Sequence, residues 1–156
     1  MLAALALRRS QPPHQAMARA MATSTVAGEA FMDLLRNGVV GADVVVIDVR
    51  EQHELALGTI HDSFAAHGIG DDSNVRYGEV ALRELVEGGA LAQDADDFEA
   101  SFGFEKPKER DTIVFTCAAG VRSAVACQAA EQAGFFSTVN YSGGWNEWQA
   151  QYHRSC

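Results

Sequence analysis

The residues best suited to chemistry in this 156-residue chain lie in the stretch Thr112–Ser123, T-I-V-F-T-C-A-A-G-V-R-S. Its first part, Thr112–Thr116, is a short apolar and β-branched run that predicts a buried strand. Cys117 follows at once, and an Ala-rich segment with helical spacing begins at Val121. In an open α/β sheet, ligands bind outside the carboxyl ends of the strands. Cys117 therefore stands where chemistry is expected.

The turn that begins at Cys117 combines small residues with one cation. Small residues let the backbone curl until several N–H groups point at one spot, and Gly120 can take a positive φ at no steric cost. The N-terminus of the following helix adds partial positive charge, Arg122 adds a full charge, and Ser123 can cap the helix. Such surroundings lower the pKa of a thiol, which predicts a nucleophilic thiolate at Cys117. The residues predicted to form the surrounding anion-binding loop are Ala118, Ala119, Gly120, Val121, Arg122 and Ser123.

Three motifs carry a resemblance to a known family. C-A-A-G-V-R at 117–122 resembles Cys-x-x-Gly-x-Arg, the active-site loop of rhodanese-type sulfurtransferases. D-V-R-E-Q-H-E-L-A-L-G-T-I at Asp48–Ile60 resembles the family's Asp-Val-Arg-x-x-x-Glu-x-x-x-Gly-x-Ile. Y-S-G-G-W-N-E-W at Tyr141–Trp148 resembles its Gly-Gly followed by a last helix that carries Trp. The segment F-G-F-E-K-P-K at Phe102–Lys108 narrows the resemblance to small single-domain thiosulfate sulfurtransferase-like proteins of eukaryotes.

The resemblance implies an α/β rhodanese fold, with a central five-stranded parallel sheet and helices on both faces. The alternation of β and α signals along the chain independently predicts a parallel sheet covered in this way. The implied activity is that of a sulfurtransferase without a cofactor. Cys117 would accept a sulfane sulfur from thiosulfate or a persulfide donor and pass it to cyanide or to a thiol such as glutathione. Asp48 and Arg50 are expected to support the fold beside the loop, with Arg50 paired to Asp48 or Glu54.

Two other functions stay open at this point. A phosphatase or arsenate reductase of the same fold has five residues between Cys and Arg, whereas four stand between Cys117 and Arg122. The smaller ring suits a single sulfur atom. A non-enzymatic rhodanese-like binding or regulatory module often lacks the Cys, which this chain keeps. At the level of single residues, an inert core thiol is the alternative for Cys117 and a surface charge is the alternative for Arg122.

The other elements must position the loop. A continuous apolar run at 43–49 predicts a strand buried on both faces, with Asp48 at its carboxyl end. Further strands are predicted at Thr25–Val26 and Thr138–Tyr141. Helices are predicted over Glu29–Asn37, Glu79–Glu87, Asp96–Phe102 and Trp145–Tyr152.

The cysteines and histidines indicate neither a disulfide scaffold nor a metal site. Three cysteines, at positions 117, 127 and 156, are few and odd in number, which fits a reducing compartment. Cys127 falls inside the predicted helix and is expected to be a core thiol, and Cys156 is terminal. The histidines lack metal-ligand spacing and no Cys-x-x-Cys is present, so we expect no metal. No apolar run approaches the ~18 residues of a membrane span.

Residues 1–23 differ from the rhodanese-like domain expected over residues 24–154. They are Ala-rich, carry Arg8, Arg9 and Arg19, and contain no acidic residue, which predicts a mitochondrial transit peptide, with a plastid one as the alternative. A disordered tail of a cytoplasmic protein is the other possibility. Removal of this segment would change the net charge from −9 to −12. So acidic a domain is a poor partner for nucleic acid or anionic lipid, and the expected partners are a small anionic sulfur donor and a thiol acceptor. The sequence predicts no oligomeric state.

Overall fold

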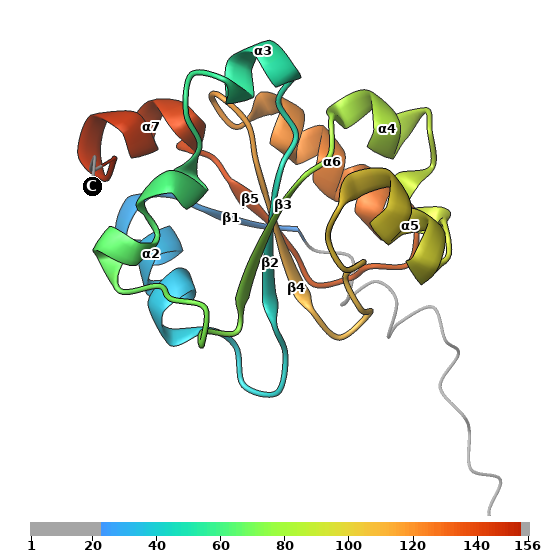
Figure 1. Cartoon of the computed structure of the whole chain (residues 1–156), viewed down its shortest axis with the longest axis horizontal. Coiled ribbons are helices and arrows are strands. Elements are labelled where there is room, and N and C mark those ends of the chain that lie inside the picture. Colours follow the sequence, from blue (N-terminus) through green and yellow to red (C-terminus); the bar gives the residue numbers. More distant parts are fainter. Residues whose placement is uncertain (1–22, 154–156) are drawn as a thin grey trace, which may run out of the picture.

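The computed structural model describes residues 23–153 of the chain. The targeting segment predicted over residues 1–23 lies outside this part, apart from Thr23, and so does Cys156. In the described part, strands alternate with helices, and Figure 1 shows a central sheet with helices packed on two sides. No helix among the described residues is long and apolar enough to cross a membrane.

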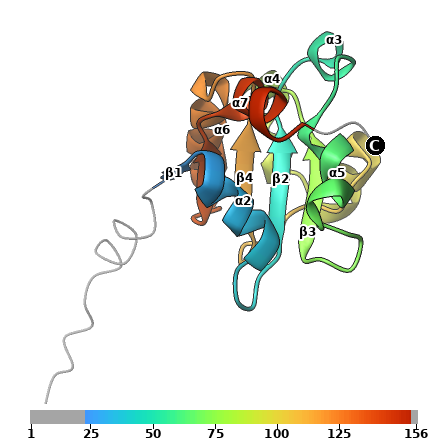
Figure 2. The same ribbon diagram turned by 90° about the vertical axis from the view of Figure 1, so that its left-hand side faces the viewer.

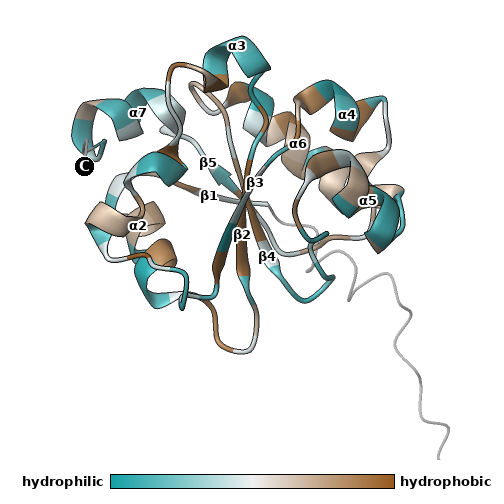
Figure 3. Ribbon diagram, in the orientation of Figure 1, coloured by the Kyte–Doolittle hydropathy of each residue, from teal (hydrophilic) through white to brown (hydrophobic). Residues whose placement is uncertain are grey.

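The sheet contains five parallel strands in the order β1-β5-β4-β2-β3. Every residue of β2, β4 and β5 is buried, because helices cover both faces of the sheet. Figure 2 shows β4 and β2 side by side with their arrowheads pointing the same way, and Figure 3 shows apolar colour along both. The strands are Ser24–Val26 (β1), Val44–Asp48 (β2), Val75–Glu79 (β3), Thr112–Thr116 (β4) and Thr138–Tyr141 (β5).

Helices cover the two faces of the sheet unequally. In Figure 1, α2 and α7 lie on one side of the sheet, and α4, α5 and α6 lie on the other. The short α3 follows β2 at the carboxyl edge of the sheet. The helices are Gly28–Asn37 (α2), Gln52–Leu55 (α3), Leu82–Val86 (α4), Ala95–Phe102 (α5), Val121–Gln132 (α6) and Gly144–Gln151 (α7). Three short 3-10 helices are Ile60–Ser63 (η1), Ala65–His67 (η2) and Ala90–Ala92 (η3).

Each face of the sheet has its own hydrophobic core. Successive residues of a strand point to opposite faces, and β2 follows this rule. Val44 and Val46 pack in the core under α2 and α7, whereas Val45 and Ile47 pack in the core under α4, α5 and α6. The predicted five-stranded parallel sheet with helices on both faces is confirmed.

Most predicted elements are found close to their expected bounds. The strands Thr112–Thr116 and Thr138–Tyr141 match, and the helices predicted at Glu29–Asn37, Asp96–Phe102 and Trp145–Tyr152 lie within one residue of α2, α5 and α7. Their sequences are either continuously apolar or clearly amphipathic, so the local pattern suffices to locate them.

The edge strand β3 is the exception. Its sequence pattern predicts no strand, and the prediction of a helix from Glu79 is wrong because the helix begins only at Leu82. The strand reads V-R-Y-G-E, and most of its side chains are half-buried because it lies at the edge of the sheet beside β2. An added Cβ at Gly78 would collide with the ring of Phe104. Because the strand contains one glycine and two charged residues, its sequence shows no continuous apolar run.

The register of the sheet brings the two main motifs together. Asp48, the last residue of β2, pairs with Thr116, the last residue of β4. Beyond this pair, the Val49 N–H donates to the Thr116 carbonyl at 2.9 Å. The segment that follows Asp48 and the loop that begins at Cys117 therefore leave the same edge of the sheet side by side.

Candidate active site

Two N–H groups of the loop Cys117–Ser123 point at the Cys117 sulfur. The Gly120 N–H donates to Sγ at 3.1 Å and the Ser123 N–H at 3.4 Å. The carbonyl groups at the start of the loop face the other way, toward α7. There the Cys117 carbonyl accepts from the Trp145 N–H at 2.8 Å, and the Ala118 carbonyl accepts from the Asn146 N–H at 3.1 Å. The first turn of α7 thus holds the loop in its inward-facing conformation.

Two glycines allow this close packing of the loop against the start of α7. Gly120 has φ +84° and Gly144 has φ +58°, both in the left-handed region that favours glycine. A Cβ on Gly120 would lie 2.5 Å from the Ser142 carbonyl oxygen, and a Cβ on Gly144 would lie 2.5 Å from the Cys117 carbonyl oxygen. Any larger residue at either position would force the two segments apart.

Cys117 is buried at the floor of the loop, with 1% of its surface exposed. Burial by itself raises the pKa of the Cys117 thiol, since it disfavours the charged form. The Ser123 hydroxyl, when it turns toward the sulfur, and the N–H groups of Ser123, Ala119 and Gly120 stabilise the thiolate by hydrogen bonds that outweigh this effect. The pKa of Cys117 therefore lies below its ordinary value. This direction is the one predicted from the residue types of the loop.

Ser123 contacts the sulfur and does not cap the helix as expected. The N-cap position of α6 is Gly120, which provides no side-chain cap, and Ser123 is the third residue of the helix. Its side chain turns inward, so that Oγ lies 3.3 Å from Sγ of Cys117 and donates to Oδ1 of Asn140 at 2.6 Å. The predicted residue is in the site, but with a different role.

Arg122 forms a two-point ion pair with Glu54 of α3. Its Nη1 and Nη2 donate to Oε2 and Oε1 of Glu54, both at 2.7 Å. The pair is partly exposed, with 35% of the Arg122 side chain and 24% of the Glu54 side chain open to solvent. The sequence predicts that Arg122 belongs to the anion-binding loop, with a surface charge as the alternative. This geometry ties the loop to α3, and Glu54 offsets the arginine charge.

Asp48 and Arg50 form a buried ion pair behind the loop. The exposed fractions are 1% and 2%, and the Arg50 Nη2 lies 2.9 Å from the Asp48 Oδ2. Arg50 also donates to the Gly58 carbonyl at 2.9 Å and lies 5.1 Å from the centre of the Trp145 ring. Of the two partners that the sequence left open for Arg50, the side chain of Asp48 is the one observed. Glu54 contacts Arg50 only through its carbonyl oxygen.

Sequence reasoning missed Asn140, a buried polar residue of β5 with 6% of its surface exposed. Its Nδ2 donates to the Gly120 carbonyl at 3.1 Å, and its Oδ1 accepts from Ser123. The signal that could have found it is an amide within the otherwise buried strand T-V-N-Y, since a buried polar group needs a partner.

Cys127 lies apart from the loop, in the core beneath α6. None of its surface is exposed, and burial raises the pKa of this thiol to about 12. The prediction of a core thiol is confirmed by this position. Among the described residues, no cluster of His, Cys, Asp or Glu has the arrangement of a metal site.

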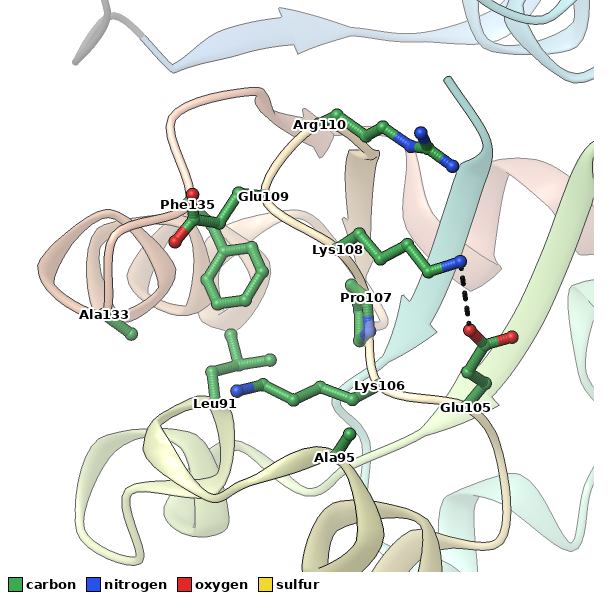
Figure 4. A pocket seen from close by; sticks show the side chains of 10 residues that line it. All are labelled: Leu91, Ala95, Glu105, Lys106, Pro107, Lys108, Glu109, Arg110, Ala133 and Phe135. Atoms are coloured by element: carbon green, nitrogen blue, oxygen red, sulfur yellow. Dashed lines mark ion pairs between the residues drawn. The ribbon is translucent and has the colours of Figure 1, made fainter. Parts of the chain in front are cut away.

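A separate hollow of about 670 Å³ lies at the opposite edge of the sheet. It is lined by residues 105–110, which precede β4, and by Ala133 and Phe135, which precede β5. Figure 4 shows Lys106 lying across it and Lys108 turned toward Glu105. The full length of β4 separates this hollow from Cys117, so it takes no part in the site described here.

Comparisons of this chain with known proteins point to the same family as the three sequence motifs. The model of a family described as rhodanese-like domain matches residues 31–151. A mouse protein named thiosulfate sulfurtransferase/rhodanese-like domain-containing protein 3 is 37% identical over 107 residues, which are 68% of this chain and 58% of the mouse protein. This chain therefore spans less than two thirds of that relative's length.

A human sequence and a human solved structure are each matched over most of their length. A protein named thiosulfate:glutathione sulfurtransferase is 30% identical over 115 residues, which cover 73% of this chain and 86% of the relative. The solved structure of the human single-domain sulfurtransferase TSTD1 has a TM-score of 0.65 at 29% identity, and the match covers 85% of this chain and 100% of that chain. Since the family model matches well over half of the chain, the protein belongs to the rhodanese-like domain family.

Proposed function

We propose that this protein is a sulfurtransferase of the thiosulfate sulfurtransferase type, with Cys117 as its nucleophile. The observation that carries the proposal is the set of N–H groups aimed at one buried sulfur, with Gly120 N–H at 3.1 Å and Ser123 N–H at 3.4 Å. Donors fixed in this way stabilise a thiolate, and they can also stabilise the negative charge of a sulfur atom added to it.

The reaction has two half-reactions. In the first, the Cys117 thiolate attacks the outer sulfur of thiosulfate, a new S–S bond forms, and the old S–S bond breaks as sulfite leaves with the electron pair. In the second, an acceptor thiolate attacks the outer sulfur of the Cys117 persulfide, takes that sulfur and restores the Cys117 thiolate. Such covalent catalysis predicts ping-pong kinetics. No resident cofactor enters either step.

A thiol is the proposed acceptor in the cell. Two relatives, from human and from budding yeast, are named thiosulfate:glutathione sulfurtransferase, which supports a small thiol as acceptor. Glutathione is therefore the first acceptor to test, with cyanide as the assay nucleophile. A persulfide can take the place of thiosulfate as donor in the same chemistry.

Thiosulfate binding depends on the backbone of the loop more than on the Arg122 side chain. The Arg122 charge is offset by Glu54, and the chain carries a net charge of −9. At long range such a chain repels a dianion. The N–H groups of the loop and the first turn of α6 provide the local positive potential instead.

The phosphatase alternative is not favoured, because the loop keeps only four residues between Cys117 and Arg122. A purely non-enzymatic module is not favoured either, since the thiol has its N–H donors and a lowered pKa.

The direct test is an assay of thiosulfate:cyanide and thiosulfate:glutathione transfer with the full chain and with Cys117→Ser. We expect activity in the full chain and background rates in the variant, because a hydroxyl has neither the acidity nor the nucleophilicity of the thiol. Substantial residual transfer by a folded Cys117→Ser protein would refute the assignment.

We also propose a mitochondrial location, based on the composition of residues 1–23. Relatives from fission and budding yeast carry the word mitochondrial in their names, which supports the proposal. Residues 1–28 fused to a fluorescent reporter should direct it to mitochondria. A reporter that stays in the cytosol would contradict this part of the proposal.

A further inference from the structure

Asn140 lies behind the candidate active site without touching the sulfur. It stands in β5, next to β4, and its side chain bridges two points of the loop. Nδ2 donates to the Gly120 carbonyl at 3.1 Å, and Oδ1 accepts from the Ser123 hydroxyl at 2.6 Å. One amide thus contacts both the start and the first turn of α6.

The orientation of the amide follows from its two partners. A carbonyl oxygen can only accept a hydrogen bond, so the group that faces the Gly120 carbonyl has to be the NH₂ of Asn140. The amide oxygen then faces Ser123 and can only accept. The single hydroxyl proton of Ser123 is therefore directed to Asn140.

This arrangement fixes what Ser123 offers to Cys117. Its Oγ lies 3.3 Å from Sγ, but with the proton on the Asn140 side it presents lone pairs to the sulfur. A protonated Cys117 can donate its S–H to these lone pairs. A thiolate gains a hydrogen bond from Ser123 only if the hydroxyl rotates and gives up its bond to Asn140.

We propose that Asn140 is a positioning residue, which competes with Cys117 for the Ser123 hydroxyl proton and so sets how much of the active-site thiol is ionised. The proposal rests on Cys117 being the nucleophile of the proposed function. In this arrangement the thiolate depends mainly on the N–H groups of Gly120 and Ser123.

The elements around Cys117 carry two ion pairs and one further carboxylate. On α6 and α3, Arg122 is paired with Glu54, and at the end of β2 Asp48 is paired with Arg50. The first turn of α7 carries Glu147. In each of the two ion pairs the positive and negative charges offset one another. The position of a single hydroxyl proton can therefore change the ionisation of the Cys117 thiol measurably.

The test compares four full-length proteins: the unmodified chain, Asn140→Ala, Ser123→Ala and the double variant. The thiolate fraction is measured from its ultraviolet absorbance against pH, with Cys117→Ser variants of each as the blank. In Asn140→Ala the hydroxyl is free to donate to sulfur. We expect its thiolate fraction at a fixed pH below the midpoint to rise at least about threefold, since a hydrogen bond to a charged group is stronger than one to a neutral group.

The double variant distinguishes competition for the Ser123 hydroxyl proton from a simple loss of packing around the loop. Loosening of the loop at Gly120 occurs in both backgrounds, whereas competition for the proton requires the Ser123 hydroxyl. We expect the Asn140→Ala effect to vanish when Ser123→Ala is present. An equal effect in both backgrounds, or no rise at all, would overturn the proposal.

A second measurement does not require the Asn140→Ala protein to fold. Because Asn140 holds the Ser123 proton, Ser123→Ala alone should change the thiolate fraction less than about twofold. A fall of more than about twofold would show that Ser123 donates freely to the thiolate, and the proposal would then be wrong. Since the absorbance reports ionisation and not sulfur transfer, either result is independent of whether the proposed activity is found.

Discussion

Arg122 and Glu54 lie 68 positions apart in the sequence and meet through two hydrogen bonds of 2.7 Å each. The pair joins α6, which begins in the active loop, to α3, which follows the Asp48–Arg50 pair. Arg122 is the first cause that lowers the pKa of Glu54, to about 2 from its ordinary 4.5. The contact between the motif at Asp48–Ile60 and the active loop therefore depends on the ionisation of Glu54.

The titration of Glu54 predicts how the contribution of the ion pair to stability depends on pH. The folded-state pKa of Glu54 is depressed, so the unfolded chain binds more protons in this window. The stabilisation is fully present above pH 4.5 and is lost as the pH falls toward about 2. In urea unfolding, Glu54→Gln should be less stable than the unmodified chain at neutral pH, and the gap should narrow as the pH is lowered through this window. Glu99→Gln, an exposed site on α5, is the control and should show no such pattern. A gap that stays constant with pH would contradict the assigned cause.

The glycine at the start of α7 tests the packing of the loop. Gly144→Ala places a Cβ 2.5 Å from the Cys117 carbonyl oxygen at φ +58°. We expect at least about a tenfold loss of sulfur transfer, since small displacements of catalytic groups have large effects on rate. Gly103→Ala is the matched control, because its φ is +78° but nothing lies within 4 Å of the added Cβ. The left-handed backbone alone should cost each variant on the order of 1 kcal/mol of stability; Gly144→Ala should lose more because of the clash, while Gly103→Ala keeps its activity. Equal activity in the two folded proteins would contradict the packing argument.

The length of the loop should decide between sulfur and phosphate chemistry. A persulfide presents one terminal sulfur, whereas a phosphoryl group presents three equatorial oxygens that need donors. Insertion of one Gly between Ala119 and Gly120 widens the ring and moves the Gly120 N–H away from its 3.1 Å contact with sulfur. We expect sulfur transfer to fall at least about tenfold, and aryl-phosphate hydrolysis to be absent from the unmodified chain. Paired assays on both proteins measure this, and robust phosphatase activity in the unmodified chain would reject the argument from ring size.

Cys127 provides the control for cysteine chemistry. It is fully buried in the core under α6, and burial raises its pKa to about 12. Cys127→Ala should therefore keep most of the sulfur-transfer activity, with only a small loss of stability. Steady-state kinetics beside those of Cys117→Ser measure this. A loss as large as that of Cys117→Ser would mean that Cys127 acts as a resolving thiol.

The sequence predicts those parts of the site that lie in one continuous segment of the chain. The strand Thr112–Thr116, the following Cys117 and the helix from Val121 are contiguous, and local pattern locates all three. The roles that depend on other segments could not be read in this way. Ser123 can cap a helix by residue type, yet its side chain turns inward and donates to Asn140 of β5, a partner that lies in another segment of the chain.

The partners of an ion pair could be predicted only where both lie in the same local segment. Asp48 and Arg50 are two residues apart, and their pairing is one of the two alternatives that the local sequence allows. The pairing of Glu54 with Arg122 depends on where α3 stands relative to α6, which the local sequence does not contain. Likewise β3 is a strand because β2 pairs with it, although its own residues show no apolar run.

The intact mass of the protein after treatment with thiosulfate reports whether Cys117 accepts a sulfur atom. If Cys117 is the sulfur-accepting nucleophile, the full chain should gain about 32 Da, the mass of one sulfur atom, and glutathione or cyanide should remove it. Cys127→Ala should gain the same mass and Cys117→Ser should not. If the protein gains no mass under conditions of turnover, or if Cys117→Ser gains as much as the unmodified chain, Cys117 is not the sulfur-accepting nucleophile.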